Sequence, residues 1–556
     1  MKRAIREWRL PPPGGADGIV ERIATARGLG SLLLPEAEVA ESDPMLLQQM
    51  DRALELIREA CQSRGRIAIY GDYDADGVTA TALLVGGLRG LGPEPLAYIP
   101  DRQSEGYGLH QEALRELHAR GVTLVITVDC GTSAVEVARE RPSDLRLVIT
   151  DHHLPHLGET GQLELPKVDA LINPRVPQDS YPFKGLAGVG VAYQLLRALE
   201  LQGMLPAGGA SRQLPLVALG TVADMMPLQD ENRRLVQGGL RVWSEFAPPG
   251  LRLLAGAGSV TSQDLAFRLA PRINAAGRMG DARPALDCCL ADDESKARAA
   301  VARLEELNRA RKESLTRALA QARAQAALLP EELPLLFLGS ADFHPGVVGL
   351  VAGRLVEEFG RPAFVFSRQG DGAWRGSARG VAGLNVVAAL AACADQLLTF
   401  GGHLSAGGFS LAPSEDSVAA LARELELAVT KQLGGRSPVR TFQVDAEVRL
   451  GQCDLELADQ LLRLQPCGSG NPQALLCASG LRVEATRSLG AGGNHLKVIL
   501  QDGTGTAEAI TFNRPHLRRH LPEGRLVDAI FELEVDCWLG RRRPRLLLRD
   551  LRPARS

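Results

Sequence analysis

Short apolar segments alternate with helical segments along the first third of the chain. The apolar segments occupy residues 65–70, 95–100, 123–129 and 145–151, and a helical pattern such as 79–91 lies between them. Alternation of this kind is typical of a parallel β-sheet covered by helices, because each crossover between parallel strands needs room for a helix. We therefore predict an α/β fold with a parallel sheet for this region.

The remaining chain divides into further domains. Residues 292–329 contain neither Gly nor Pro and begin with acidic residues, which predicts one long connecting helix. A second α/β pattern follows, and beyond a glycine-containing linker at 434–438 short strand-like runs predict a small β-barrel of the OB type. The predicted parts are an N-terminal arm at 1–60, an α/β domain at 61–290, a helix at 291–330, a second α/β domain at 331–434 and an OB-like barrel at 439–556.

Composition narrows the classes of function. The formal net charge is −3, so any surface that binds a polyanion has to be locally basic. Residues 541–556 contain seven Arg and one acidic residue, and could form such a surface. The alternative is that this basic tail is simply a solvated chain end. Nine Cys without a CxxC pair argue against a disulfide framework and a structural zinc site. No apolar run is long enough to span a membrane, and we expect a cytoplasmic protein.

Three acidic residues follow the first predicted strand within the sequence GDYDADG at 71–77. Asp72, Asp74 and Asp76 crowd like charges at a strand end, which is unfavourable unless a cation or a proton neutralises them. A solvated acidic turn is the alternative. An EF-hand is excluded because its twelfth loop position, counted from Asp72, is Leu83 rather than Glu.

Two further strand ends carry potential metal ligands. Asp129 ends one predicted strand, and Asp151-His152-His153 ends the next. Because the carboxyl ends of parallel strands share one crevice, we expect these side chains to converge with Asp74 and Asp76. Asp224 lies between apolar stretches, where an unpaired acid is costly. Several carboxylates with one imidazole favour Mn²⁺ or Mg²⁺ over zinc.

These motifs resemble those of the DHH phosphoesterase superfamily, and within it the RecJ exonucleases. The resemblance rests on GDYDADG, Asp129, DHH at 151–153 and GTVADMMPL, together with DRQSEGYGL at 101–109, APRINAAGRMG at 270–280 and GGHLSAGGFS at 401–410. It implies a DHH catalytic domain at 61–290, a DHHA1 domain that handles phosphate at 331–434 and a nucleic-acid-binding OB-like domain at 439–556.

The resemblance also implies roles for the metal ligands. Asp74 and Asp76 would hold one ion each, Asp129 would bridge two Mn²⁺ or Mg²⁺ ions, and His152 and Asp224 would complete the second site. His153 would contact the phosphate or the leaving oxygen. The RecJ version of the motif also contains Asp72, which we include among the metal ligands. Many superfamily members have His where this chain has Tyr70, so Asp72 or water would compensate.

The remaining motifs imply substrate contacts. Arg272, Asn274 and Arg278, in one Gly-containing loop, suit phosphate oxygens, and Ser377, Arg379 and His403 with the Gly401 and Gly402 backbone could hold a terminal 5′-phosphate. The motif at 101–109 adds Arg102 and Tyr107. For any single arginine, a plain surface charge is the alternative. In the barrel, Trp538, Arg541, Arg542 and Arg543 are candidates for single-strand binding, and a core position is the alternative for Trp538.

The function implied is a two-metal, single-stranded-DNA-specific 5′→3′ exonuclease of DNA repair and recombination. The family further implies single-strand-binding protein and a RecQ-type helicase as partners. Two alternatives stay open: a DHH hydrolase of cyclic dinucleotides, short oligoribonucleotides or pyrophosphate, and a non-catalytic replication adaptor that binds nucleic acid. The filled ligand positions disfavour the adaptor, and the OB-like extension disfavours the small-substrate hydrolase.

Overall fold

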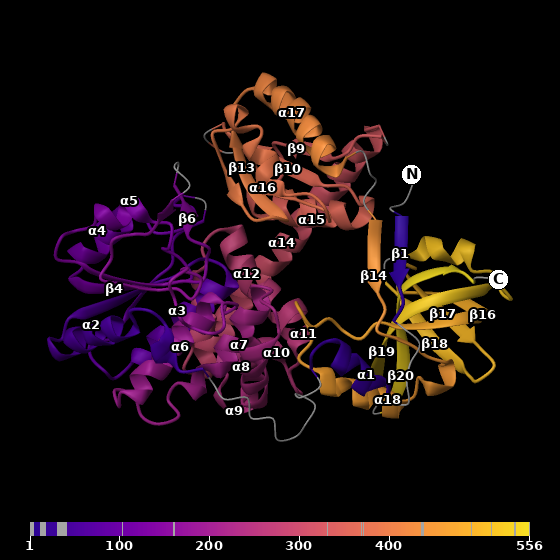
Figure 1. The fold of residues 1–556 in the computed structure, drawn as a ribbon, viewed down its shortest axis with the longest axis horizontal. Coiled ribbons are helices and arrows are strands. Elements are labelled where there is room, and N and C mark those ends of the chain that lie inside the picture. The colour runs from indigo at the N-terminus through magenta and orange to yellow at the C-terminus, as the bar shows by residue number, and fades with distance from the viewer. Residues whose placement is uncertain are drawn as a thin grey trace. The chain divides into compact units, whose positions relative to one another are not determined.

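A computed structural model describes most of the chain, and the statements below concern its described residues (Figure 1). Those residues are 5–11, 18–29, 42–102, 104–158, 162–330, 332–368, 370, 372–434, 439–490, 492–512, 514–538 and 541–554. The chain forms two compact units. The first contains residues 41–439 and 468–470, and the second contains residues 6–40, 440–467 and 471–556.

The first unit begins with a five-stranded sheet in which all strands are parallel, as predicted. Its strand order is β3-β2-β4-β5-β8. The strands are β2 (Arg66–Tyr70), β3 (Leu96–Tyr98), β4 (Val122–Val128), β5 (Arg146–Thr150) and β8 (Ala170–Ile172). Two short strands, β6 (His156–Leu157) and β7 (Leu163–Glu164), form a separate hairpin.

Helices cover both faces of this sheet. One face packs against α4 (Gln111–Ala119) and α5 (Val135–Arg139), and the other against α2 (Met50–Gln62), α3 (Ala75–Leu88) and α6 (Gly188–Leu201). Helix α3 is buried along nearly its whole length, because its Ala-, Gly- and Val-rich sequence has no polar face to expose. A helical layer follows, made of α7 (Leu214–Ala223), α8 (Asp230–Arg241), α9 (Trp243–Phe246), α10 (Pro249–Ala255), α12 (Ala270–Met279) and α13 (Arg283–Leu290).

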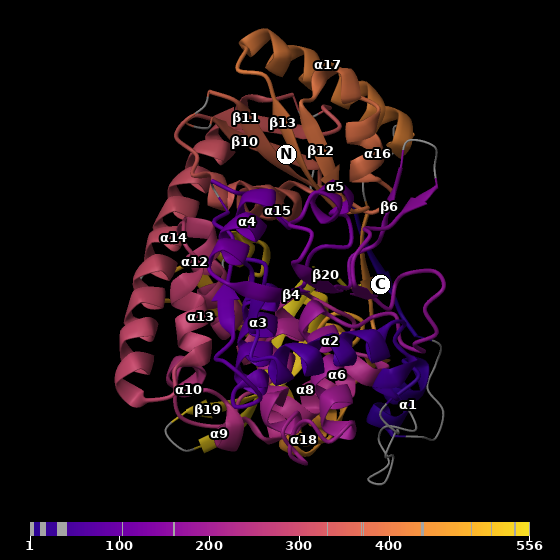
Figure 2. The same cartoon turned by 90° about the vertical axis from the view of Figure 1, so that its left-hand side faces the viewer.

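The predicted long helix is α14 (Glu294–Leu328), which Figure 2 shows over its length beside α12 and α13. It begins where the Asp293 carboxylate accepts a hydrogen bond from the Lys296 N–H at 2.8 Å. Ala300 and Leu304 pack into the core of the first sheet's domain, whereas Ala318 and Ala322 pack into the core of the next domain. The helix is therefore a shared wall of two domains rather than a free connector.

The second α/β domain contains a mixed five-stranded sheet of order β12-β13-β11-β10-β9. Only β9 and β10 are parallel, and the remaining pairs are antiparallel. The strands are β9 (Leu336–Ser340), β10 (Ala363–Arg368), β11 (Trp374–Arg379), β12 (Thr399–Gly402) and β13 (Ala406–Leu411). One face packs against α14 and α15 (Val348–Phe359), and the other against α16 (Val386–Ala391) and α17 (Glu415–Leu433) (Figure 1).

The second unit is a closed five-stranded barrel, which confirms the predicted OB-type fold. Its strands pair in the order β16-β17-β18-β20-β19, and β19 pairs back with β16 to close the barrel. They are β16 (Leu476–Leu489), β17 (His495–Gln501), β18 (Thr506–Thr511), β19 (Leu526–Trp538) and β20 (Arg541–Pro553). Helix α18 (Leu455–Leu461) contributes Leu457 and Ala458 to the core.

The predicted N-terminal arm at 1–60 is not one piece, which corrects the sequence interpretation. Strand β1 (Ile5–Arg9) pairs with β14 (Val439–Gln443), and α1 (Ile19–Ala26) buries Val20 and Ile23 in the barrel core. Helix α2 instead packs in the first sheet's domain. The apolar faces of α1 and α2 each predict burial, but a sequence alone does not say against which core. Among the described residues no helix is long and apolar enough to cross a membrane.

Candidate active site

The predicted acidic residues gather at the carboxyl ends of β2, β4 and β5. Beyond β2 the chain turns at Asp72 and enters α3, which Asp74 caps: its Oδ1 accepts hydrogen bonds from the N–H groups of Asp76 and Gly77 at 2.9 and 3.1 Å. The cap fixes one oxygen of Asp74 and leaves the other for a ligand. Asp72 is buried behind this turn.

Asp129 follows β4 in a left-handed conformation, with φ of 60°. Few residues other than Gly adopt this conformation, and it costs free energy that the surrounding structure has to supply. The Asp129 N–H donates to the Thr150 carbonyl at 3.0 Å, which holds the turn against β5. The turn directs the carboxylate toward the first residue of α6, where only a glycine fits: a Cβ on Gly188 would lie 2.7 Å from Asp129 Oδ1.

Asp76 lies at the same helix terminus. Its Oδ2 and Oδ1 accept hydrogen bonds from the N–H groups of Gly188 and Val189 at 2.7 and 2.9 Å. The N-terminus of α6 therefore stabilises this buried negative charge with two backbone donors. The interaction joins residues 112 positions apart along the chain, which explains why the sequence does not reveal it.

Asp151 organises the turn that carries the two histidines. Its Oδ1 accepts from the His152 and His153 N–H groups at 2.7 and 3.1 Å and lies 2.8 Å from His153 Nδ1, while its Oδ2 accepts from Thr132 N–H. The Asn173 amide donates to the His153 carbonyl at 2.9 Å. Asp151 is thus a positioning residue, and the sequence analysis named it only as part of the DHH motif.

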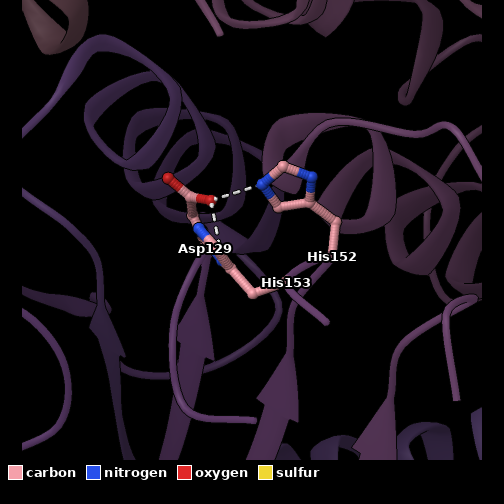
Figure 3. A group of neighbouring side chains, drawn as sticks. All are labelled: Asp129, His152 and His153. Carbon is pink, nitrogen blue, oxygen red and sulfur yellow. Dashed lines mark ion pairs between the residues drawn. The ribbon is translucent and has the colours of Figure 1, made fainter. Parts of the chain in front are cut away.

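His152 lies close to three of the acids, and Figure 3 shows its ring beside the Asp129 carboxylate. Its Nε2 is 3.1 Å from Asp129 Oδ1, 3.6 Å from Asp224 Oδ2 and 3.8 Å from Asp76 Oδ2. Asp224 is the C-cap residue of α7, and its side chain is 29% exposed. Of the residues predicted to bind metal, one group of close donor atoms is formed by Asp76, His152 and Asp224, and another by Asp72, Asp74 and Asp129.

Several of these donor atoms have no hydrogen-bond partner although they are buried. They are Asp72 Oδ1, Asp129 Oδ1 and both ring nitrogens of His152. Buried polar atoms are nearly always satisfied, and the loss of a partner costs roughly 1–3 kcal/mol each. Atoms that approach one another without bonding, like Asp129 Oδ1 and His152 Nε2, are arranged as ligands around a common cation.

The electrostatics of the cluster lead to the same conclusion. Burial and then the neighbouring carboxylates raise the pKa of Asp76 and of Asp129 well above the ordinary value. Burial and the charge of Asp74 raise the pKa of Asp224 to about 7. Burial and the charge of His153 lower the pKa of His152 to about 3, so its imidazole is neutral and can bind a metal. Divalent cations would remove the repulsion among the acids.

The donor set therefore fits hard divalent cations. Carboxylate oxygens outnumber the single buried imidazole, which is the composition expected for Mn²⁺ or Mg²⁺. His153 differs from His152. Burial opposes its protonation, but the hydrogen bond and the charge of Asp151 raise the pKa of His153 to about 9, so it is a cation at neutral pH. The Tyr107 hydroxyl lies 3.4 Å from its Nε2.

A cavity of about 320 Å³ opens over the acids, and its walls include Tyr107, His153, Arg102 and Arg278. A second cavity, of about 420 Å³, lies between α15 and the strands β11, β12 and β13. Arg102 and Arg278 line both cavities. Arg102 also stacks on the ring of Tyr73, 5.0 Å from its centroid. The two arginines thus connect the acidic cluster to the second cavity.

The segment at 270–280 is not a loop but helix α12, which corrects the sequence interpretation. Asn274 and Arg278 are four residues apart and share a face that lines the first cavity. Arg272 lies on another face, where its Nε donates to Glu305 at 2.7 Å, and it lines neither cavity. Asn274 Oδ1 accepts from the Ala75 N–H at 2.9 Å and so supports the metal-binding turn.

The predicted phosphate ligands of the second domain are brought together only in part. Ser377 and Arg379, on β11, line the second cavity with Gly402, whereas Gly401 and His403 do not. Arg379 Nη1 donates to Ser377 Oγ at 3.0 Å. Arg375 and residues of the segment 345–349 at the start of α15 also line this cavity, and neither was predicted from the sequence. The alternation along β11 and the HPG sequence before a helix were available signals.

Two further expectations are settled by geometry. Tyr70 is not a metal ligand, because its hydroxyl donates to the Gly108 carbonyl at 2.9 Å and its ring packs on the face of the sheet opposite α3.

The basic tail predicted from the sequence is strand β20, and much of its charge is paired. Arg542, Arg549 and Arg552 form ion pairs with Asp459, Glu532 and Asp528, respectively. Arg541 and Arg543 are exposed, and the Trp538 side chain lies outside the described part of the chain.

Family models match three regions of the sequence. The DHH family N-terminal domain matches residues 66–221, the DHHA1 domain matches 332–431 and the RecJ OB domain matches 444–550. The matched regions coincide with the first sheet, the second sheet and the barrel.

Curated relatives extend the similarity over the whole chain. The single-stranded-DNA-specific exonuclease RecJ of Dickeya dadantii is 34% identical over 99% of this chain and 98% of the relative. The Bacillus subtilis protein of the same name is also 34% identical, over 91% of this chain, which spans 64% of that longer relative.

Two solved structures of a relative have a similar fold, and each contains a divalent metal ion. The crystal structure of Thermus thermophilus RecJ in complex with Mn²⁺ has a TM-score of 0.83 at 31% identity, covering 99% of this chain and 80% of that one. Its complex with Mg²⁺ gives a TM-score of 0.77 at 29% identity, over 99% and 79%. The predicted cofactors are those found in these related structures. The chain belongs to the RecJ family of single-stranded-DNA-specific exonucleases.

Proposed function

We propose that this protein is a metal-dependent exonuclease that degrades single-stranded DNA from the 5′ end, one nucleotide at a time. The observation that carries the proposal is the connection of two unlike cavities. One is lined by His153 and by four carboxylates of the metal cluster, and the other by arginines. Arg102 and Arg278 are walls of both. A strand held at its end in the arginine cavity would present its first phosphodiester to the cluster.

The metal cluster would hold two divalent cations. Asp76, His152 and Asp224 would form one site, Asp72 and Asp74 the other, and Asp129 would belong to both, since it lies within ligand distance of each group. The bound ions supply an activated water and neutralise charge on the attacking and leaving oxygens. The buried setting of Asp76 and Asp129 keeps those charges out of bulk solvent, where they would be screened.

The chain's own residues position the phosphodiester and supply a proton. His153 is held by Asp151 through Nδ1, so the other ring nitrogen can donate from a protonated imidazole to a phosphate or leaving oxygen in the cavity. Arg278 offers a planar set of donors that suits two phosphate oxygens. Burial and nearby Arg102 lower the pKa of Arg278 to about 10, which leaves it charged at neutral pH.

The 5′ polarity would come from recognition of the terminal phosphate. Ser377 and Arg379 lie on one strand face beside the first turn of α15: a Cβ on Gly349 would be 3.0 Å from Ser377 Oγ and 3.2 Å from an Arg379 guanidinium nitrogen. A helix N-terminus, a hydroxyl and a guanidinium together suit a doubly charged phosphate. An internal phosphate carries one charge, so a free 5′ end would be preferred.

Single-stranded DNA is the substrate that the names of the relatives specify, and we extend it to this chain. We place the activity in DNA repair and recombination in the cytoplasm. Single-strand-binding protein and a RecQ-type helicase are partners that could deliver such strands. The barrel would add a contact for longer strands, as OB folds do through stacking and positive charge.

The decisive assay compares strands labelled at either end. A 5′-labelled single strand with Mn²⁺ or Mg²⁺ should release labelled mononucleotide from the earliest times, while a 3′-labelled strand should shorten progressively. EDTA and the Asp129→Asn variant should both abolish cleavage. Release of labelled mononucleotide first from the 3′ end, or hydrolysis of a cyclic dinucleotide in preference to the strand, would contradict the proposal.

A further inference from the structure

One arginine beside the metal cluster has no role in the function proposed above. Arg175 follows β8 and lines neither of the two cavities. Its backbone N–H donates to Asn173 Oδ1 at 2.9 Å, and the Asn173 amide donates in turn to the His153 carbonyl at 2.9 Å. Because Asn173 is buried, this link fixes Arg175 next to the turn that carries the two histidines.

The guanidinium of Arg175 is held at one nitrogen only. Its Nε donates to the Lys184 carbonyl at 3.3 Å, in the segment that leads into α6. Within the described part of the chain its two Nη groups have no hydrogen-bond partner, and the side chain is half-buried. The nearby Lys184 differs, because its Nζ donates to the Asp179 carbonyl at 2.7 Å. Arg175 therefore offers two unused donors of a planar set, which suits a phosphate.

Arg175 and Arg102 flank different cation sites of the cluster. Burial is the main cause that raises the pKa of Asp72, and the charge of Arg102 is among the effects that oppose the rise. Burial also raises the pKa of Asp224, and there the charge of Arg175 is among the opposing effects. Burial lowers the pKa of His152, and the charge of Arg175 adds to that effect. Asp72 belongs to one group of potential ligands, and His152 and Asp224 belong to the other.

These positions define a course for a strand across the cluster. Arg102 also lines the arginine cavity, which would receive the terminal phosphate. A strand held there would pass Arg102, bring its first phosphodiester to the cations and continue toward Arg175. His403, on the turn between β12 and β13, is within reach of the same charge: burial lowers the pKa of His403, and His153 and Arg175 lower it further. The strand would thus leave the cluster between basic groups of both α/β domains.

We propose that Arg175 is a substrate-binding residue that contacts the second phosphodiester of the strand, one nucleotide to the 3′ side of the bond that is cleaved. The inference rests on the proposed function. The terminal phosphate and the first phosphodiester already have other partners, whereas the second phosphodiester has none. A dinucleotide lacks this second linkage, so the contact would favour longer strands over dinucleotides.

Strands with one uncharged linkage test the contact. Three ten-nucleotide thymidine strands carry a labelled 5′-phosphate. One has only phosphodiesters, one has a methylphosphonate as its second linkage, and one has a methylphosphonate as its sixth. The release of labelled mononucleotide by the full-length protein with Mn²⁺ gives kcat/KM for each strand. We expect the second-linkage substitution to lower kcat/KM about tenfold, as the loss of one charge-assisted hydrogen bond allows, and the sixth-linkage substitution to stay within twofold.

In Arg175→Ala the second-linkage substitution should have no further effect, because the contact is already lost. Arg175→Lys keeps the charge and should retain most of the tenfold difference. Arg120→Ala is the matched control, because Arg120 is an exposed arginine of the same domain that pairs with Glu116 and lines neither cavity. Each result is a ratio of two strands measured on one protein preparation, so a partly unfolded variant does not alter it.

A tenfold difference that survives in Arg175→Ala, or no difference between the second and sixth linkages in the unmutated protein, overturns the inference and leaves the proposed function in place. Loss of the preference for a 5′-phosphate in Arg175→Ala would assign Arg175 to recognition of the strand end and would also overturn the inference. If the unmutated protein released no mononucleotide from the strand of phosphodiesters, the proposed function would be overturned, and the inference with it.

Discussion

The two cavities of the first unit are built from opposite charges and from different kinds of secondary structure. The acidic cluster lies where parallel strands end, so that turns after β2, β4 and β5 bring Asp72, Asp129 and His152 together. The arginine cavity lies along the middle of an antiparallel strand, against a helix N-terminus. In the proposed function the first would hold the cations that perform the chemistry, and the second would hold the anionic end of the substrate.

Two separate cavities allow an exonuclease to catalyse cleavage at one place and to recognise a strand end at another. Changes in the acidic cluster should abolish cleavage of every substrate, whereas changes in the arginine cavity should alter which ends are cut. Arg102 and Arg278 belong to both cavities and should affect both properties. The substitutions below test that division.

The largest effect is expected for Asp129→Asn. Loss of the shared carboxylate should lower kcat by at least about 100-fold, since stabilisation of the transition state by the cations is worth several kcal/mol. Without metal, however, the variant should unfold at the same temperature as the unmutated protein or higher, because a buried charge repelled by its neighbours is removed. Steady-state kinetics and thermal unfolding in EDTA measure the two quantities. Asp144→Asn, at an exposed aspartate, is the control.

Arg278→Ala should lower kcat/KM by roughly 30-fold, because a charge-assisted hydrogen bond to phosphate, worth about 1.5–3 kcal/mol, would be lost. The kcat/KM of Arg272→Ala should stay within about threefold of the value for the unmutated protein, although Arg272 and Arg278 lie in one sequence motif. Its ion pair with Glu305 is largely at the surface, where such pairs contribute little to stability. If both substitutions impaired cleavage equally, the division of α12 into two faces would be wrong.

Arg379→Ala should reduce the preference for a 5′-phosphate over a 5′-hydroxyl from at least about tenfold to near unity, since it removes a charged hydrogen bond to the terminal group. The affinity for Mn²⁺ should not change, because Arg379 lines only the second cavity. Rates on both ends and a Mn²⁺ titration check the two statements. A variant that lost metal affinity would show that the cavities are not separate in function.

Gly188→Ala should weaken Mn²⁺ binding by about fivefold, the smallest of these effects, because its Cβ would displace the Asp129 carboxylate and cost of order 1 kcal/mol. Gly190→Ala, two residues further along α6, is the matched control, because the side chain nearest to its Cβ would be that of Leu186, at 3.3 Å. Equal Mn²⁺ affinity in both variants would remove the steric argument for Gly188.

Sequence reasoning was most successful where functional residues adjoin strand ends. Asp74, Asp76, Asp129 and His152 could be placed in one crevice because parallel strands align their carboxyl ends. It was less successful where the neighbours are remote in sequence. The N-terminus of α6, which holds Asp76, follows it by more than a hundred residues, and no local pattern predicts that contact.

The arginine cavity shows the same limit. Ser377 and Arg379 were identified through a motif, but Arg375 was missed. Side chains alternate between the two faces of a strand, so Arg375 lies on the same face of β11 as Ser377 and Arg379. Arg272 was placed on the substrate because α12 was taken for a loop, and a helix separates residues that a loop would keep together. The N-terminal arm was misassigned because an apolar face does not specify its partner.

Anomalous diffraction from crystals of this protein grown with Mn²⁺ tests the two-cation site directly. Two anomalous peaks are expected in the acidic cluster. One should be in contact with Asp76, His152 and Asp224, the other with Asp72 and Asp74, and both with Asp129. A single peak, or two peaks of which neither contacts Asp129, would contradict the claim that the buried carboxylates and the imidazole form a shared two-cation site.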